Sequence, residues 1–436
     1  MKKFLLCAAL FGSISYAVHA QQPISVEKRI CASADVYKQM MQNDPVFAQN
    51  QKQLEEFTQR FIQNGGASSV TGKTGTYIYT IPVIVHVVYN TTTQNISDAQ
   101  INSQITVLNQ DYQKLNSDVG LVPSVWTSLV ANAQIRFCLA TIDPNGAATT
   151  GIRRVSTSTT SFSTNNNVKF TSKGGDNAWD SKKYLNLWVC KLGGGVLGYA
   201  QFPGGAVSTD GVVITYTGFG NTGTAKAPYN KGRTATHEIG HWLNLRHIWG
   251  DDGGACTGSD LVGDTPNQGK EHYGCPVFPK VTCSNGPNGD MFMNYMDYTD
   301  DRCMYMFSNG QKDRIYATLQ SGGSRYSVTV SGKCGSQPQH IVAANTSVSS
   351  ILNVVPNPIV SGVATVSYKL ATAANIQLFV ADMYGNVSKI INIGNQQAGA
   401  YNVQPAELAQ VKNGVYMMKL IADGKEIANT RFMVSK

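Results

Sequence analysis

Three histidines and one glutamate within residues 237–247 have the types and spacing needed to bind and use a metal ion. His237 and His241 are four positions apart, so on a helix their imidazoles lie on one face and can bind the same ion. Glu238 lies beside the first histidine, where a carboxylate acts as a general base rather than as a ligand. Zinc takes neutral imidazole nitrogens, and a catalytic zinc keeps one coordination position open. The pattern therefore predicts a catalytic zinc site.

A third histidine makes this prediction more specific, because the five-residue pattern alone can occur by chance on a soluble helix. His247 follows His241 by six positions, too far along a straight helix to lie on the same face. The chain must therefore turn after His241 for His247 to reach the metal. Asn244 stands where the turn is needed, and asparagine is the non-glycine residue best suited to left-handed backbone angles. We expect the helix, at about residues 234–243, to end there.

Residues 237–247 resemble the extended zinc signature of the metzincin peptidases, HExxHxxGxxH, with Asn244 in place of the usual glycine. Residues 294–298, Asn-Tyr-Met-Asp-Tyr, resemble the Met-turn of the same peptidases. The resemblance covers roughly residues 81–319. The cysteines crowded around these motifs are similar to those of the pappalysin family, which contains ulilysin-like bacterial enzymes: Cys256, Cys275, Cys283 and Cys303.

This resemblance implies a role for each residue of the site. The three histidines would bind one catalytic zinc ion, while Glu238 takes a proton from water. Met296 would form the hydrophobic floor beneath the zinc, and the Tyr298 hydroxyl would hydrogen-bond the oxyanion of the transition state. The family pairing would join Cys256 to Cys283 and Cys275 to Cys303. The implied activity is that of a secreted zinc endopeptidase.

The resemblance also suggests a second ion and a binding edge for substrate. Asp260, Asp264 and Thr265 supply the oxygen ligands that calcium prefers, and pappalysin relatives hold structural calcium in the matching stretch. The alternative is a polar turn without an ion. Residues 195–200 resemble the rim strand that pairs with an extended peptide, although they could equally be an ordinary strand of the sheet.

Cys31 lies in the N-terminal segment, away from the other cysteines, and has two interpretations. It could form a disulfide, with Cys334 as the most plausible partner. Alternatively it could keep a precursor inactive, because a thiolate binds zinc strongly and the catalytic ion has an open position. We expect Lys28 and Arg29 to favour this thiolate electrostatically. Several metzincins, including some pappalysin relatives, are held latent in this way, which favours a zymogen.

The scaffold that positions these residues is predicted to be an α/β metzincin-type catalytic domain with a mixed, mostly parallel sheet and two helices. Residues 79–89 are too continuously apolar for an exposed edge strand. Ser97 is expected to cap a helix whose apolar face runs from Ile101 to Leu115. Further strands are expected at residues 135–142, 184–192 and 211–216. Residues 250–310 form an irregular subdomain that ends in a short helix at residues 311–319.

The chain divides into five predicted segments. Residues 1–20 have the basic start, apolar run and small residues of a signal peptide. Residues 21–75 form a polar pro-segment, with a helical pattern broken at Pro45 and a linker at residues 65–69. The catalytic domain follows at residues 76–334, then a linker at 335–350. Residues 351–436, in which short alternating strands recur between turn signals such as Tyr384-Gly385-Asn386, form an all-β sandwich.

The C-terminal sandwich resembles the sorting domain of the Bacteroidetes type IX secretion system, in Pro356-Asn357-Pro358, residues 413–416 and the ending at residues 431–436. This resemblance implies secretion or attachment to the outer-membrane surface of a Gram-negative cell, with the secretion machinery as a partner. An adhesive or carbohydrate-binding module is the competing interpretation.

Composition excludes several classes of protein. The formal charge of +8 comes from 35 Lys and Arg against 27 Asp and Glu, without a basic block of the kind that binds nucleic acid. No stretch after the signal peptide is apolar enough to cross a membrane. We expect a monomer that cleaves extracellular proteins or peptides. The main alternative is a surface adhesin with a structural zinc, but a structural site needs no base and closes its fourth position with a protein ligand.

Overall fold

The computed structural model describes residues 28–70, 79–334, 352–370, 373–382 and 387–436. They belong to two compact units, divided after Lys333. The expected signal peptide, the linker at residues 335–350 and the turn at Tyr384-Gly385-Asn386 lie outside the described residues.

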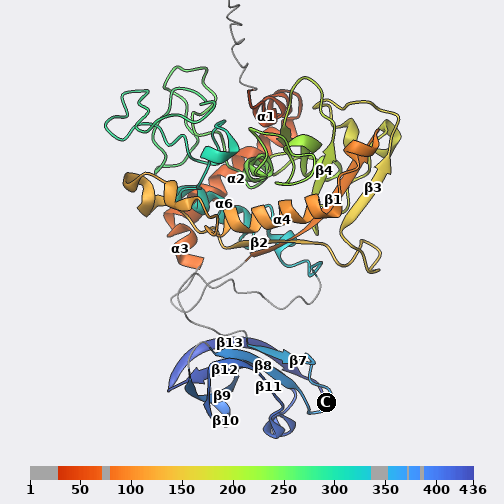
Figure 1. The fold of residues 1–436 in the computed structure, drawn as a ribbon, viewed down its shortest axis with the longest axis vertical. Helices are drawn as coiled ribbons and strands as arrows, with labels where there is room; N and C mark the ends of the chain where they lie inside the picture. Colours follow the sequence, from red (N-terminus) through yellow and green to blue (C-terminus); the bar gives the residue numbers. More distant parts are fainter. Residues whose placement is uncertain (1–27, 71–78, 335–351, 371–372, 383–386) are drawn as a thin grey trace, which may run out of the picture. The chain divides into compact units, whose positions relative to one another are not determined.

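The first unit is built on a mostly parallel sheet in the order β2-β1-β4-β6-β5 (Figure 1). Its central strand β1 is buried at nearly every position, as its continuous apolar run predicted. β2 pairs with the first half of β1 and β3 with the second half, while β5 alone runs antiparallel to its neighbour β6. The strands are β1 (Tyr79–Tyr89), β2 (Ile135–Leu139), β3 (Ile152–Ser156), β4 (Leu185–Cys190), β5 (Gly198–Ala200) and β6 (Val212–Thr215).

The strands β1, β2, β4 and β6 lie where the sequence predicted them, but β2, β4 and β6 are shorter than their predicted ranges. β2, β4 and β6 all lie inside the predicted ranges. β3 was missed, because its sequence Ile-Arg-Arg-Val-Ser is polar and mostly exposed, without an apolar run to mark it. Its pairing with β1 depends on the neighbouring strand rather than on its own composition.

Helices α4 (Asp98–Tyr112) and α5 (Arg233–Trp242) contact each other and the sheet, and their apolar residues share its main core. Ser97 caps α4 as predicted, accepting a hydrogen bond from the backbone N–H of Gln100. Leu115 was expected on the buried face of α4 but lies beyond the end of the helix. The irregular residues that follow α5 lead to α6 (Asn309–Leu319), which a Ser308 capping box starts, and then to α7 (Tyr326–Thr329).

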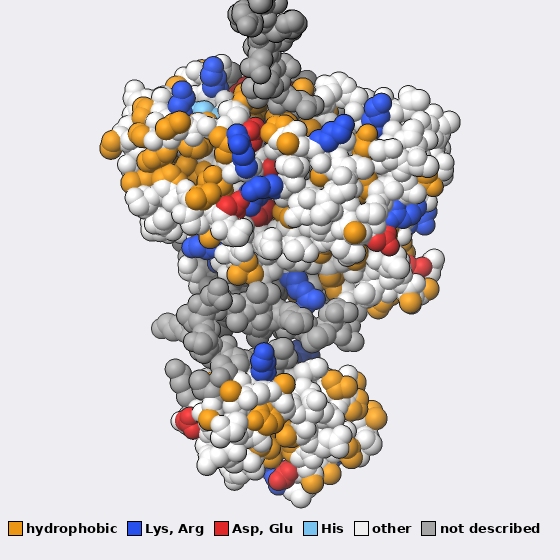
Figure 2. All heavy atoms as spheres, in the orientation of Figure 1, with side chains coloured by type: hydrophobic (Ala, Val, Ile, Leu, Met, Phe, Trp, Pro, Cys, Tyr) orange, Lys and Arg blue, Asp and Glu red, His pale blue; other side chains and the backbone are white. Residues whose placement is uncertain are grey.

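The remaining helices of the first unit's catalytic part are short 3₁₀ turns in the connections. They are η1 (Thr92–Gln94), η2 (Val119–Leu121), η3 (Ser124–Leu129), η4 (Asn167–Lys169), η5 (Thr171–Lys173), η6 (Val207–Thr209), η7 (Tyr216–Gly218) and η8 (Asp301–Cys303). The Lys and Arg side chains on the face drawn in Figure 2 are scattered rather than gathered in one basic patch. Among the described residues, no helix is both long enough and apolar enough to cross a membrane.

The N-terminal segment packs onto the catalytic part as three helices, α1 (Ser33–Asn43), α2 (Pro45–Gln63) and α3 (Gly66–Val70). The predicted break at Pro45 is confirmed, since this proline starts α2. The linker predicted at residues 65–69 was wrong, because residues from Gly66 onward are helical. The physical reason is tertiary: Ala67 is buried, and its N–H donates to Asp313 of α6 at 2.7 Å.

The second unit contains two antiparallel sheets, one in the order β10-β9-β12-β13 and one in the order β11-β8-β7. Its own core includes Val366, Leu378, Leu420 and Phe432, so the predicted β-sandwich is confirmed. Its elements are β7 (Asn353–Val355), β8 (Thr365–Leu370), β9 (Ala374–Asp382), β10 (Val387–Gln396), β11 (Gly399–Val403), η9 (Ala406–Gln410), β12 (Gly414–Ala422) and β13 (Lys425–Val434).

Because each unit has its own core, we predict that a chain ending at Cys334 folds and is active once its pro-segment is removed. Ending there keeps Cys334, which is disulfide-bonded. Circular dichroism, the melting temperature and peptide cleavage should match those of the catalytic unit in the whole chain. An insoluble or inactive product would mean that the second unit supports the first.

Candidate metal centre and active site

The metal centre begins on α5, whose ten residues are all buried. His237 and His241 lie one turn apart on this helix. Asn244 follows with φ of 72°, the left-handed conformation that was predicted, and the backbone N–H of Leu245 returns to the carbonyl of Gly240 at 2.9 Å. This reversal of the chain brings His247 back to the same point as the two helical histidines.

Four electron-rich atoms converge there. The Nε2 atoms of His237, His241 and His247 are 3.1 to 3.3 Å apart, and the Cys31 sulfur lies 3.5 Å from Nε2 of His241. A tetrahedral zinc with Zn–N bonds of about 2.0–2.1 Å and a Zn–S bond of about 2.3 Å would separate its nitrogens by about 3.3 Å and sulfur from nitrogen by about 3.6 Å. The donor set therefore fits zinc in both chemistry and spacing.

The other ring nitrogens determine which form each histidine takes. Nδ1 of His237 donates to the carbonyl of Tyr295 at 2.7 Å, and Nδ1 of His241 donates to the carbonyl of Leu245 at 2.8 Å. Nδ1 of His247 faces the carboxylate of Asp251 at 2.8 Å. With the proton on Nδ1, each Nε2 has a free lone pair for a metal. Asp251 was not predicted to have a role, although its spacing of four from His247 was a signal.

Cys31 reaches the centre by lying along β5. The backbone N–H of Leu197 donates to the carbonyl of Ile30 at 2.9 Å, and that of Ala32 donates to the carbonyl of Gly198 at 3.0 Å. Cys31 is a free, buried cysteine, so the alternative of a disulfide with Cys334 is wrong. Cys334 and Cys138 are both disulfide-bonded, and Cys190 is free and buried.

Glu238 points to the same place and is also held by the pro-segment. Its Oε2 accepts a hydrogen bond from the Ser33 hydroxyl at 2.7 Å and lies 3.4 Å from the Cys31 sulfur. Burial raises the pKa of Glu238 to about 7, against the opposing effect of the bond from Ser33. Gly198 leaves room for this carboxylate, since a Cβ there would lie 2.8 Å from Cγ of Glu238. Ser33 was not predicted, although it follows Cys31 by only two positions.

Met296 lies against α5 and Tyr298 packs against the histidines. A Cβ on Gly240 would lie 2.5 Å from the Met296 sulfur, so this glycine lets the methionine pack directly under α5. The Tyr298 hydroxyl donates to the carbonyl of Cys31 at 3.1 Å, and its ring packs edge-on against His247. The structure thus brings both residues to the histidines.

Lys28 and Arg29, which were expected to favour the Cys31 thiolate, contact other groups. Burial and the charge of Glu238 raise the pKa of the Cys31 thiol well above its usual range. Arg29 instead fills a buried pocket, where it pairs with Asp301 at 2.6 Å and lies over the ring of Tyr229, while Lys28 lies over another aromatic ring. Both cations meet partners that only the folded chain brings near, which the sequence alone did not show.

The disulfide-rich segment contains the pairs Cys256–Cys283 and Cys275–Cys303, the pairing that the resemblance implied. It brings together two of the three residues expected to bind calcium: Asp260 is buried and accepts a hydrogen bond from the Thr265 hydroxyl at 2.7 Å. Burial raises the pKa of Asp260 to about 7. Asp264 is engaged at the start of α6, where it accepts from Ser308 at 2.6 Å.

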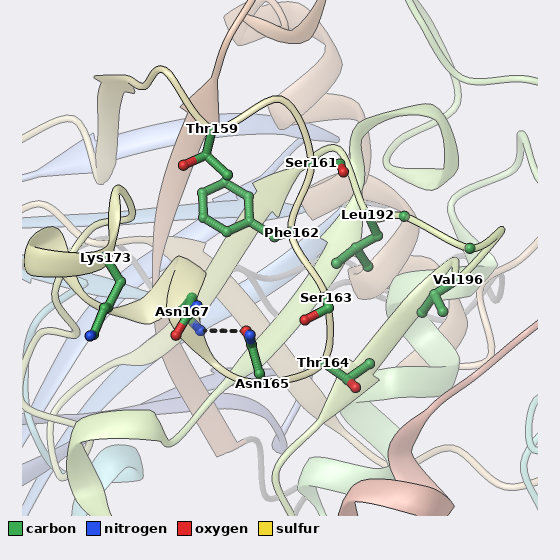
Figure 3. Close-up of a pocket in the computed structure, with 12 residues that line it drawn as sticks. Thr159, Ser161, Phe162, Ser163, Thr164, Asn165, Asn167, Lys173, Leu192 and Val196 are labelled. Atoms are coloured by element: carbon green, nitrogen blue, oxygen red, sulfur yellow. Dashed lines mark hydrogen bonds between the residues drawn. The ribbon is translucent and has the colours of Figure 1, made fainter.

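One hollow reaches the centre. This cavity of about 130 Å³ is lined by His241, Phe202 and residues of α1. A larger pocket of about 490 Å³ lies beside the approach to β5, lined by hydroxyls and amides together with Phe162, Leu192 and Val196 (Figure 3). It contains none of the metal-binding side chains. Among the described residues, the only cluster of metal-binding side chains found is Cys31 with the three histidines.

Comparisons with known proteins agree with this geometry. The model of the peptidase M43 family, described as pregnancy-associated plasma protein-A, matches residues 170–320. An extracellular metalloprotease of Pyricularia oryzae is 34% identical over 259 residues, covering 56% of this chain and 77% of the relative. One of Arthroderma otae is 31% identical over 278 residues, covering 61% and 86%.

Solved structures extend the match to the pro-segment. A promirolysin variant of Tannerella forsythia is 49% identical, with a TM-score of 0.63, and the match covers 69% of this chain and 97% of that one. Mature mirolysin of the same species, in complex with a cleaved peptide, is 55% identical with a TM-score of 0.58, covering 59% and 97%.

A mostly parallel sheet that carries a metal centre on α5, above a methionine, defines a metzincin-type zinc metallopeptidase. The chain belongs to the pappalysin-like peptidase M43 family. It is a secreted zinc endopeptidase made as a zymogen.

We predict that Asp251→Asn lowers the zinc affinity of the activated enzyme by about 10- to 100-fold, because the amide holds the His247 ring less firmly than a carboxylate. Competition with a chromophoric chelator measures this affinity directly. Asp143→Asn, which alters a carboxylate in a remote turn, is the matched control. Equal affinity in the two variants would remove Asp251 from the site.

Proposed function

We propose that His237, His241 and His247 bind the catalytic zinc and that Glu238 is the general base for peptide-bond hydrolysis. The observation that carries this proposal is the convergence of three unprotonated nitrogens and one sulfur at the spacing of zinc ligands. A bound zinc supplies the Lewis acidity that activates water and polarises a carbonyl.

The side chains around the ion then complete the chemistry. Glu238 accepts a proton from the attacking water and returns it to the leaving amine. Tyr298 donates a hydrogen bond from its hydroxyl to the oxygen that becomes negative in the transition state. In the precursor the same hydroxyl donates to the carbonyl of Cys31, which takes the place of the substrate carbonyl. Met296 is the apolar floor. β5 is an edge strand, so an extended substrate adds to it as the pro-segment does.

We propose that latency has two parts. Cys31 occupies the fourth ligand position, and Ser33 donates its hydroxyl to Glu238 while accepting from the backbone N–H of Ala200 at 2.7 Å. The metal and the base are therefore blocked by separate side chains of the same segment. Removal of residues 21 to about 75 would release both.

We also propose that the enzyme cleaves beside arginine. The carboxylate of Asp301 lies beside the centre, where the side chain of Arg29 reaches it. Arg29 is 1% exposed there, and its guanidinium pairs with Asp301 and lies over Tyr229. A substrate arginine next to the scissile bond would take the place of Arg29 once the pro-segment leaves.

A structural calcium ion at Asp260 and Thr265 is a further proposal. Asp260 forms no ion pair with any of the described residues, and a calcium ion would offset the cost of burying its carboxylate. Asp264 could join the ligands only by giving up Ser308. A melting temperature that EGTA leaves unchanged would argue against this ion.

We propose that residues 351–436 are a sorting domain recognised by a type IX secretion system, and that the enzyme is a monomer released or held at the cell surface. Support comes from the separate β-sandwich core and from the sequence resemblance. The chain ending at Cys334 should then stay inside the producing cell. Its normal export would contradict the sorting role.

Glu238→Ala should lower kcat by about 10² to 10⁴-fold while zinc content stays at the wild-type value, because the base is lost and the ligands remain. Tyr298→Phe should lower kcat by about 100-fold with little change in KM. Steady-state kinetics and metal analysis of the activated enzyme measure both. A Glu238→Ala enzyme close to wild-type activity would refute the assignment.

Cys31→Ala should raise the activity of the uncleaved precursor, and Cys31→Ala with Ser33→Ala should raise it further, because the second change also frees the base. Activity is measured before processing, in precursors whose intact length is checked by mass spectrometry. Ser68→Ala, which alters an exposed serine of α3 in the same pro-segment, is the control. Equal latency in all three precursors would rule out both contacts.

Asp301→Asn should lower kcat/KM for arginine substrates by about 100-fold and leave substrates with a neutral isostere nearly unchanged. Asparagine keeps an oxygen for the backbone N–H groups of Lys231 and Arg233, from which Asp301 also accepts. Matched peptides that contain arginine or citrulline give the comparison. Equal loss on both peptides would mean that Asp301 only supports the fold.

A further inference from the structure

His272 lies in the disulfide-rich segment and is held between two buried carboxylates. Its Nε2 is 3.2 Å from Asp290, its Nδ1 is 3.0 Å from Asp297, and its side chain is 8% exposed. A neutral imidazole has one donor and one acceptor nitrogen, so a ring that meets a carboxylate at each nitrogen can donate to both only when it is doubly protonated. Burial opposes the charge, but hydrogen bonds to Asp290 and Asp297 outweigh it and raise the pKa of His272 to about 9.

Asp297 connects this ring to the active site. It stands between Met296 and Tyr298 in the turn below the metal ligands. One of its oxygens accepts from the backbone N–H of Tyr298 at 2.7 Å and from the backbone N–H of His272 at 2.8 Å, and the other faces the His272 ring. The carboxylate of Asp297 therefore ties the turn that carries Tyr298 to the stretch around His272.

Asp290, on the other side of the His272 ring, is held by hydrogen bonds as Asp297 is. Asp290 also accepts hydrogen bonds from Thr282 at 2.7 Å and from Asn285, both in the disulfide-rich segment. Gln268 donates to Asp297 at 2.8 Å, beside the ring. Tyr298 meanwhile packs against His247 and Trp249 with ring centroids 4.9 and 4.8 Å away. Any movement of Asp297 would thus change where the Tyr298 hydroxyl lies relative to the ligands.

We infer that His272 is a positioning residue for hydrolysis: bridging Asp290 and Asp297, it fixes the turn that aims the Tyr298 hydroxyl at the reacting carbonyl. The inference rests on the proposed role of Tyr298. It gives the disulfide-rich segment a part in catalysis, because that segment, residues 256–303, supplies the ring and both of its carboxylates. A misplacement of about 1 Å in such a group costs on the order of 100-fold in rate.

Two variants of the activated full-length enzyme test this. His272→Gln removes the bridging cation and leaves two buried carboxylates without it. His272→Gln with Asp290→Asn removes the cation and one of these carboxylates together, so we expect the double variant to fold even if the single variant does not. We expect kcat to fall about 10- to 100-fold in both, with KM within about twofold of wild type and zinc content unchanged. Adding Tyr298→Phe should cause no further loss beyond that of Tyr298→Phe alone.

His86→Gln is the matched control. His86 is another fully buried ring, 2.7 Å from Asp176 and 3.1 Å from Asn186, but it lies in β1. It should lower the melting temperature and leave kcat unchanged. If it lowers kcat as much as the His272 variants, or if those variants keep the wild-type kcat, the positioning role is overturned. If Tyr298→Phe itself keeps its kcat, the proposed role of Tyr298 fails first and the inference falls with it.

Discussion

Four electron-rich side-chain atoms that lie within 4.8 Å of one another, away from water, need a cation between them. Without it the lone pairs of three imidazoles and a sulfur would repel at close range, at a cost that burial increases. A cation there would join α5, the turn at Asn244 and the pro-segment, in addition to the hydrogen bonds and the ion pair that hold the pro-segment in place. Much of the catalytic unit serves to hold these parts at that distance.

The surrounding contacts show how firmly the ligands are oriented. Each Nδ1 has its own acceptor, from the Met-turn, from the helix end or from Asp251. These acceptors come from different segments, so the candidate metal centre links the end of α5 to the irregular subdomain. The same subdomain is crosslinked by two disulfides, which compensate for its small apolar content.

The pro-segment contacts the same groups of the active site that are proposed to act on a substrate. It adds to the edge of the sheet at β5, offers sulfur to the metal position, a hydroxyl to the base and a guanidinium to the acidic pocket. Further along, Glu55 of α2 pairs with the fully buried Arg314 of α6, whose guanidinium also donates to the carbonyl of Asn244. The contacts of the pro-segment thus extend from the candidate metal centre to the turn that brings His247 into place.

The sequence by itself predicted the three histidines that converge at the candidate metal centre and the helix that carries two of them, because spacing along a helix is a local property. It also determined β1, the cap of α4 and the left-handed turn at Asn244, each of which follows from composition or backbone preference at one place. The separate β-sandwich was predictable for the same reason, since its alternating pattern repeats between turn residues.

Tertiary structure decided what depends on partners distant in sequence. Arg29 pairs with Asp301 and not with the sulfur of Cys31, and Ser33 donates a hydrogen bond to Glu238. Asp264, which was expected to bind calcium, accepts a hydrogen bond from Ser308 at the start of α6. The helix at Gly66–Val70 and the polar strand β3 likewise exist because a neighbour supplies their hydrogen bonds. Such contacts leave no periodic trace along the chain, because the free energy that favours them comes from burial between segments that only folding brings together.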